Sequence, residues 1–120
     1  MLTSIRLEDK FSLLQNQWDP RIIAQLNDYD IKIAKIQGEF VWHSHPETDE
    51  LFLVVAGEMV MHLRDGGLPL QAGELCVVPA GVEHKPAADQ ECHILMLEPA
   101  GTRNTGDAGG ERTVAEVDWI

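Results

Sequence analysis

Two histidines, His43 and His45, stand one residue apart in a run of strand-forming residues, and Glu50 follows five residues after the second of them. Side chains alternate between the two faces of a strand, so we expect both imidazoles to project from the same face. The intervening segment 46–49 contains turn-forming residues, which allow Glu50 to fold back toward the pair. Imidazoles and a carboxylate are suitable ligands for a divalent metal ion. This spacing predicts metal-binding chemistry.

A third histidine, His84, stands far along the chain, just after the tight turn expected in the run PAGVEH at 79–84. Three imidazoles and one carboxylate suit one divalent ion of Fe, Mn, Ni, Zn or Cu, and the donor types do not choose among these metals. Such a set leaves one or two coordination positions open, which is what a catalytic metal needs.

Short strands are the elements that must position these side chains. The strand-like runs lie about 8–12 residues apart and are separated by turns containing Gly and Pro, a spacing typical of a β-sandwich or barrel rather than a β-α-β fold. These runs are 21–26, 31–36, 39–45, 51–55, 59–63, 74–78 and 92–97.

The two ends of the chain give weaker patterns. Residues 5–18 follow neither the helical nor the strand period, so we expect an irregular segment with one helical turn or an edge strand. Residues 101–110 are rich in Gly, Thr, Asn and Asp and predict a loop on the surface. The final residues, which include Trp119 and Ile120, are apolar enough to dock back onto the body of the protein.

Length and charge narrow the partners and the location of the protein. A chain of 120 residues predicts one domain. The net charge of −11 repels phosphate backbones and anionic lipids, so we expect neither nucleic acid nor membrane as a partner. The sequence has no run near the ~20 apolar residues that span a bilayer, and its start lacks the apolar block of a secretory signal. We therefore expect a cytoplasmic protein in which Cys76 and Cys92 are free thiols.

The segments that carry the candidate ligands resemble the two motifs of the cupin family. Residues 38–57, GEFVWHSHPETDELFLVVAG, resemble the first motif: a Gly, then H-x-H, a Glu and a second Gly. Residues 73–84, GELCVVPAGVEH, resemble the second motif. Gly38 stands one residue closer to His43 than the family pattern has it, and Ala88 occupies a position where the family often has Asn. Neither departure removes a candidate ligand.

The resemblance implies an all-β fold, the cupin double-stranded β-helix or jelly-roll barrel. It is a resemblance to small single-domain cupins, including the stand-alone proteins labelled mannose-6-phosphate isomerase-like. On this basis residues 1–120 form a single cupin domain, with 101–120 as a C-terminal loop and tail, and one divalent metal ion is held by His43, His45, Glu50 and His84. Lys85 is the only basic residue beside a candidate ligand, which argues against a phosphorylated sugar as substrate.

Strand alternation also predicts a pocket. If His43 and His45 face inward, Val41 does too, while Phe40 and Trp42 face outward. Counting from Glu50 places Phe52 and Val54 on the metal side, and Met61 and Met96 are further candidates for a pocket that we expect to be apolar, with few charges. The outward aromatic residues and the apolar C-terminus predict a homodimer.

These features predict a mononuclear metalloenzyme that acts on a small organic molecule, with dioxygenase, isomerase or lyase chemistry. No catalytic residue beyond the metal ligands is assigned. The alternative is a non-enzymatic module that binds or senses a small-molecule ligand through its metal. A cupin regulator of transcription would carry a DNA-binding domain, and these 120 residues show none.

Overall fold

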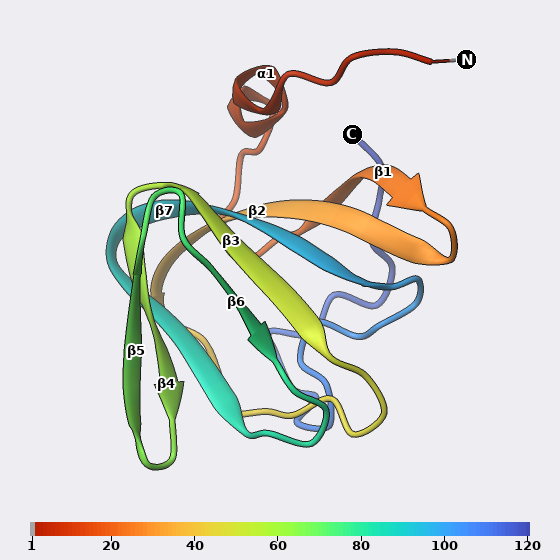
Figure 1. Ribbon diagram of the computed structural model, residues 1–120. Coiled ribbons are helices and arrows are strands. Elements are labelled where there is room, and N and C mark those ends of the chain that lie inside the picture. Colours follow the sequence, from red (N-terminus) through yellow and green to blue (C-terminus); the bar gives the residue numbers. More distant parts are fainter. Residues whose placement is uncertain (1) are drawn as a thin grey trace.

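A computed structural model of the protein describes residues 2–120, and antiparallel strands make up most of it (Figure 1). Within these residues, one short helix precedes seven strands. The elements are α1 (Leu7–Ser12), β1 (Arg21–Leu26), β2 (Tyr29–Glu39), β3 (Glu50–Ala56), β4 (Glu58–Leu63), β5 (Gly66–Gln71), β6 (Leu75–Val78) and β7 (His84–Pro99).

The long strand β7 joins the two halves of the barrel. Its first residues pair with β4, and its remaining length pairs with β2 on one edge and β3 on the other. The strand order is β1-β2-β7-β3-β6, and β5 is attached through β4. Because β7 takes part in both halves, the sheet curves around one interior, and the expected all-β barrel is confirmed.

Alternate residues of the strands fill this interior. The main core includes Ile36 of β2, Val54 of β3, Met61 of β4 and Ile94 of β7, all of them nearly inaccessible to solvent. A smaller cluster lies on the outer side of the sheet, where Phe11 of α1 packs with other apolar residues against β1 and β2. The period of two seen in the sequence therefore separates two apolar clusters on opposite faces of β2.

Three strands differ from the sequence prediction. The predicted run 39–45 is strand only at Glu39, the last residue of β2, and His43 then forms an isolated bridge with His84. The strand β5 was not predicted because Gly66, Gly67 and Pro69 are typical of turns; Pro69 is tolerated since β5 pairs on one side only. The strand β7 begins at His84, well before the predicted start at residue 92, and continues through Pro86.

The ends of the chain dock near one another. The tail runs beside β1, where Ile120 N donates to Ile22 O at 3.0 Å, and Figure 1 shows the C-terminus next to that strand. Lys10 Nζ at the end of α1 donates to Ile120 O at 2.8 Å. The predicted docking of the tail is thus seen in the structure. Within residues 2–120, no helix has both the length and the apolar character needed to cross a membrane.

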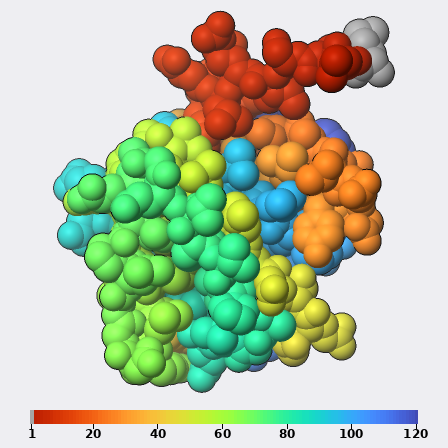
Figure 2. All heavy atoms as spheres, viewed as in Figure 1, coloured from red at the N-terminus to blue at the C-terminus, as the bar shows by residue number. Residues whose placement is uncertain are grey.

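The outer side of β3 and β6 carries an apolar face that the rest of the chain leaves accessible. Leu51 is paired with Val77 and Leu53 with Leu75, and Leu75 and Val77 are 55% and 51% exposed. The strand β6 lies at the front in Figure 1, and Figure 2 shows its segment at the surface. Apolar patches of this kind are typical of protein–protein contacts.

The sequence predicts a homodimer through Phe40, Trp42 and the apolar C-terminus, but Phe40 is buried. We propose instead that the face of β3 and β6 joins two copies of the chain. The double substitution Leu75→Lys/Val77→Lys would place charges in the contact, and light scattering at micromolar concentration should then give the mass of a monomer instead of a dimer. The control is Leu26→Lys, because Leu26 is 56% exposed at the end of β1 and lies outside this face. A monomeric wild type would contradict the prediction.

Candidate metal centre

A short irregular segment after β2 positions the first two histidines. Phe40 N donates to Pro86 O at 2.9 Å, and His43 then forms a bridge with His84, each backbone N–H donating to the other residue's carbonyl at 3.0 and 2.9 Å. From Phe40 to His43 the segment after β2 advances by three residues, whereas β7 advances by only two, from Pro86 to His84. The extra residue is a β-bulge, which interrupts the alternation of side chains.

The bulge overturns the predicted orientation of Phe40. Phe40 is only 9% exposed and lies on the same side as His43, with their rings edge to face at 5.3 Å between centroids. Val41, predicted to face the pocket, is half-buried, and its carbonyl oxygen lies 2.9 Å from His43 Nδ1. Trp42 remains half-buried, with the Arg64 guanidinium 3.9 Å from the centroid of its ring.

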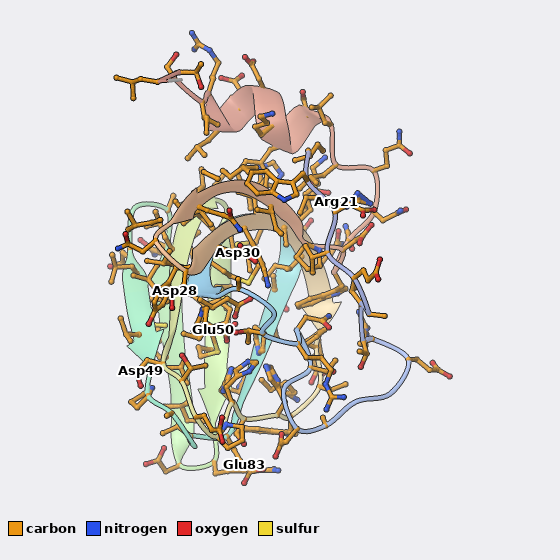
Figure 3. The ribbon with its side chains drawn as sticks, turned by 90° about the vertical axis from the view of Figure 1, so that its right-hand side faces the viewer. Arg21, Asp28, Asp30, Asp49, Glu50 and Glu83 are labelled. Atoms are coloured by element: carbon orange, nitrogen blue, oxygen red, sulfur yellow. The ribbon has the colours of Figure 1, made fainter. Side chains whose placement is uncertain are left out.

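The four predicted donors converge inside the barrel. His43 and His45 come from the segment after β2, Glu50 begins β3, and His84 begins β7. All four residues are at most 5% exposed, and one donor atom from each lies within 4.8 Å of the others. Glu50 Oε1 is 3.2 Å from His45 Nε2 and 3.4 Å from His84 Nε2. In Figure 3 Glu50 is seen within the barrel.

Hydrogen bonding leaves the inner atoms of this cluster free. The Nδ1 atoms of His43 and His84 lie 2.9 Å from the carbonyl oxygens of Val41 and Val82, so each Nδ1 must carry the proton and each Nε2 keeps its lone pair. His45 Nε2, His84 Nε2 and Glu50 Oε1 are buried without a hydrogen-bond partner. An unsatisfied buried polar atom costs about 1–3 kcal/mol. A divalent cation would satisfy all three atoms together, so the residues fit a metal ion.

The protonation states also suit metal binding. Burial lowers the pKa of His43 to about 4, and the hydrogen bond to Val41 O offsets this only in part. Burial alone would raise the pKa of Glu50, but the neighbouring Glu98 and the imidazoles of His45 and His84 lower it below its ordinary value. Near neutral pH His43 is therefore an uncharged imidazole and Glu50 a carboxylate, which are the forms that bind metals.

A cavity of about 40 Å³ lies beside the cluster and reaches His43 and Glu50. That volume accommodates a few water molecules or a small chemical group. Of the predicted pocket residues, Phe52 and Met96 line the cavity, whereas Val54 and Met61 are packed in the core and do not. Strand alternation predicts the face on which a side chain lies but not its depth in the barrel. The remaining apolar lining includes Trp18, Ile36, Phe40 and Ile94.

A buried ion pair at the cavity was missed by the sequence analysis. Lys32 Nζ is 2.8 Å from Glu98 Oε1, both residues are 1% exposed, and Glu98 lines the cavity. Burial and the neighbouring Glu50 raise the pKa of Glu98. The lining is mostly apolar with few charges, as expected, and its charged residues are Glu50 and Glu98. The sequence did contain a signal, since Lys32 and Glu98 each stand on an otherwise apolar strand face.

The loop at 101–110 packs against the ligand segment, although a surface loop was predicted. Asp107 accepts hydrogen bonds from Ser44 N at 2.8 Å and Ser44 Oγ at 3.1 Å, and Asp107 N donates to Ser44 O at 3.0 Å. A Cβ on Gly106 would come within 2.2 Å of Ser44 O, so this position requires glycine. Thr105 is fully buried and Asn104 lines the cavity. The loop thus holds Ser44 in place between two of the donors.

Known proteins resemble this chain in both sequence and structure. The family model described as cupin domain matches residues 31–98. The structure of a cupin-2 domain containing protein from Shewanella frigidimarina is 53% identical, with a TM-score of 0.78, covering 79% of this chain and 93% of that one.

Two curated relatives cover less of the chain. Uncharacterized protein YdbB of Bacillus subtilis is 36% identical over 64 residues, which is 52% of this chain and 57% of that protein. The 3-hydroxyanthranilate 3,4-dioxygenase of Ruegeria pomeroyi is 33% identical over 89 residues, which is 68% of this chain and 49% of the enzyme. The chain therefore spans about half the length of these curated relatives.

The burial of His43 predicts how the stability of the metal-free protein depends on pH. Because the pKa of His43 is about 4 in the folded chain against an ordinary value of 6.5, the unfolded chain binds a proton first as the pH falls. The free energy of unfolding should therefore decrease by on the order of 3 kcal/mol from pH 6.5 to pH 4. Urea denaturation of chelator-treated protein at a series of pH values measures this change.

The variant His43→Gln should lose that part of the pH dependence, whereas His62→Gln, which alters a histidine outside the cluster, should keep it. If the free energy of unfolding depends on pH equally in the wild type and in His43→Gln, a group other than His43 causes the pH dependence.

Proposed function

Because the chain belongs to the cupin domain family, we propose that it is a mononuclear metalloenzyme acting on a small organic molecule. The observation that carries this proposal is the set of three buried donor atoms, on His45, His84 and Glu50, that face one another without a hydrogen-bond partner beside a mostly apolar cavity. A purely structural cluster would be expected to satisfy these atoms with protein groups.

One divalent metal ion would be held by His43, His45, Glu50 and His84. When bound, such an ion supplies Lewis-acid activation of a substrate oxygen or, if redox-active, activation of dioxygen. The protein's own residues orient the donors: the carbonyl groups of Val41 and Val82 set the tautomers of His43 and His84, and Asp107 holds Ser44 between two donors.

A cavity of about 40 Å³ admits only part of a small substrate, and its aromatic lining favours a flat one. The rings of Trp18 and Phe40 are stacked at 4.9 Å between centroids, with 22° between their planes, and both line the cavity. Trp18 adopts a φ of 59°, a costly backbone conformation for a bulky residue, and its backbone N and ring Nε1 each donate at 2.8 Å to a carbonyl of β2. A stacked aromatic surface fixed in this way suits a planar ring.

Among the three reaction classes open to such a site, we favour dioxygenase chemistry on a hydroxylated aromatic ring. The matched enzyme of Ruegeria pomeroyi is named for a substrate of that kind, and the aromatic lining of the cavity is compatible with it. Within residues 2–120, the cavity lining includes no Lys or Arg, which disfavours a phosphorylated sugar. A metal-dependent binding or sensor module remains the alternative, and it would bind the same compounds without converting them.

Removal of one ligand tests the metal site. We expect His45→Ala to lower the metal content of purified protein by more than about tenfold. Loss of a residue that only hydrogen-bonds to a metal ligand typically costs about 10–100-fold in metal affinity, and loss of a direct ligand should cost at least as much. The barrel should still fold, since its core strands are apolar without this residue. Elemental analysis measures the metal, circular dichroism the fold, and His62→Ala is the control. Full metal occupancy in His45→Ala would exclude this ligand.

Oxygen consumption tests the reaction class. Protein loaded with Fe(II), Mn, Ni or Cu should consume dioxygen when a hydroxylated aromatic compound such as catechol, 2-aminophenol or 3-hydroxyanthranilate is added, and zinc-loaded protein should not, because zinc has no redox chemistry. An oxygen electrode and mass spectrometry of the products provide the measurement. Binding of these compounds with no consumption by any metal form would favour the binding module instead.

A further inference from the structure

We propose that Glu98, positioned by Lys32, is a substrate-binding residue that accepts a hydrogen bond from a hydroxyl or amino group next to the substrate atom that binds the metal. This inference rests on the proposed metal site and narrows its substrate class. Glu98 lies near the end of β7 and Lys32 lies on the adjacent strand β2, so the pair belongs to the rigid part of the barrel.

The contacts of the pair leave one oxygen free at the cavity. Lys32 Nζ donates to Glu98 Oε1 at 2.8 Å and is also 3.4 Å from Thr102 O. Glu98 Oε2 is buried and has no hydrogen-bond partner among the described atoms. Burial and the neighbouring carboxyl group of Glu50 raise the pKa of Glu98, and both residues line the cavity. Two carboxyl groups thus lie close together at the cavity.

Stability alone does not account for this arrangement. A buried ion pair is often no more stabilising than apolar residues of similar volume, because desolvation of the two charges offsets their attraction. The neighbouring positions on the same strand faces are apolar, namely Ala34 and Ile36 on β2 and Ile94 and Met96 on β7. A ligand that supplies a donor would satisfy the buried, unpartnered oxygen Oε2 of Glu98.

The cavity then defines the class of ligand. Trp18 and Phe40 provide a flat surface, and the carboxyl groups of Glu50 and Glu98 lie near one another at the metal end. A small planar molecule with two adjacent polar substituents would place one substituent on the metal and donate from the other to Glu98. A site of this kind discriminates against an analogue that lacks the donor.

Zinc-loaded protein and two small compounds test the assignment without turnover. Catechol carries two adjacent hydroxyl groups, and 2-methoxyphenol has one of them blocked. The ratio of their affinities, measured by titration calorimetry, should fall by about tenfold or more from wild type to Lys32→Met/Glu98→Met, because hydrogen bonds to charged groups contribute about this much. The two compounds also differ in how strongly they bind the metal. This difference is the same in both proteins, so it cancels when the affinity ratio of the variant is compared with that of the wild type. The zinc content should stay unchanged.

The double variant avoids a buried unpaired charge, so we expect it to fold. The matched control is Lys35→Met/Glu91→Met, which removes a Lys from β2 and a Glu from β7, neither of which lines the cavity. It should keep the wild-type ratio. If the pair has only a structural role, the urea midpoint of Lys32→Met/Glu98→Met would fall with the ratio unchanged, and that result would overturn the assignment of Glu98. Absence of zinc from the wild type would overturn the metal site as well, so the two failures are distinguishable.

Discussion

The pairing of His43 with His84 is the contact on which the candidate site depends, because it joins a segment after β2 to the start of β7. Two backbone hydrogen bonds hold the residues side by side, with their rings 4.2 Å apart between centroids. The same pairing contains the bulge that turns Phe40 into the cavity. A single irregularity in the register therefore creates both the cluster of donors and the aromatic side of the pocket.

The cluster is polar in an interior that is mostly apolar, and hydrogen bonds to the surrounding backbone reduce the free-energy cost of burying it. Carbonyl oxygens satisfy the Nδ1 atoms of His43 and His84, so only the inward-facing atoms remain without partners. On the other side of the ligand segment, Asp107 accepts hydrogen bonds from the backbone and hydroxyl of Ser44. Gly106 allows the loop to approach the ligand segment closely. These contacts prevent the donor side chains from turning away to find other partners.

The cavity has two chemically different ends. Apolar and aromatic side chains form most of its surface, while Glu50 and Glu98 form a charged end, with Lys32 paired to Glu98 behind it. This division is typical of small-molecule sites, in which apolar surface provides affinity and a few polar groups provide orientation. Cupin domains share the barrel, but a fold does not determine a reaction, so the side chains of the cavity carry the functional argument.

The sequence by itself determined the donors, the strand character of the chain and the limits of β1, which agree with the predicted run 21–26. Spacing along a strand and the resemblance of two motifs are local properties, and local periodicity decides which residues share a face. Tertiary structure alone decided the bulge before His43, the depth that places Phe52 but not Val54 at the cavity, and the meeting of Lys32 with Glu98. These features depend on how distant strands align, because a shift of one residue in register exchanges the two faces of a strand.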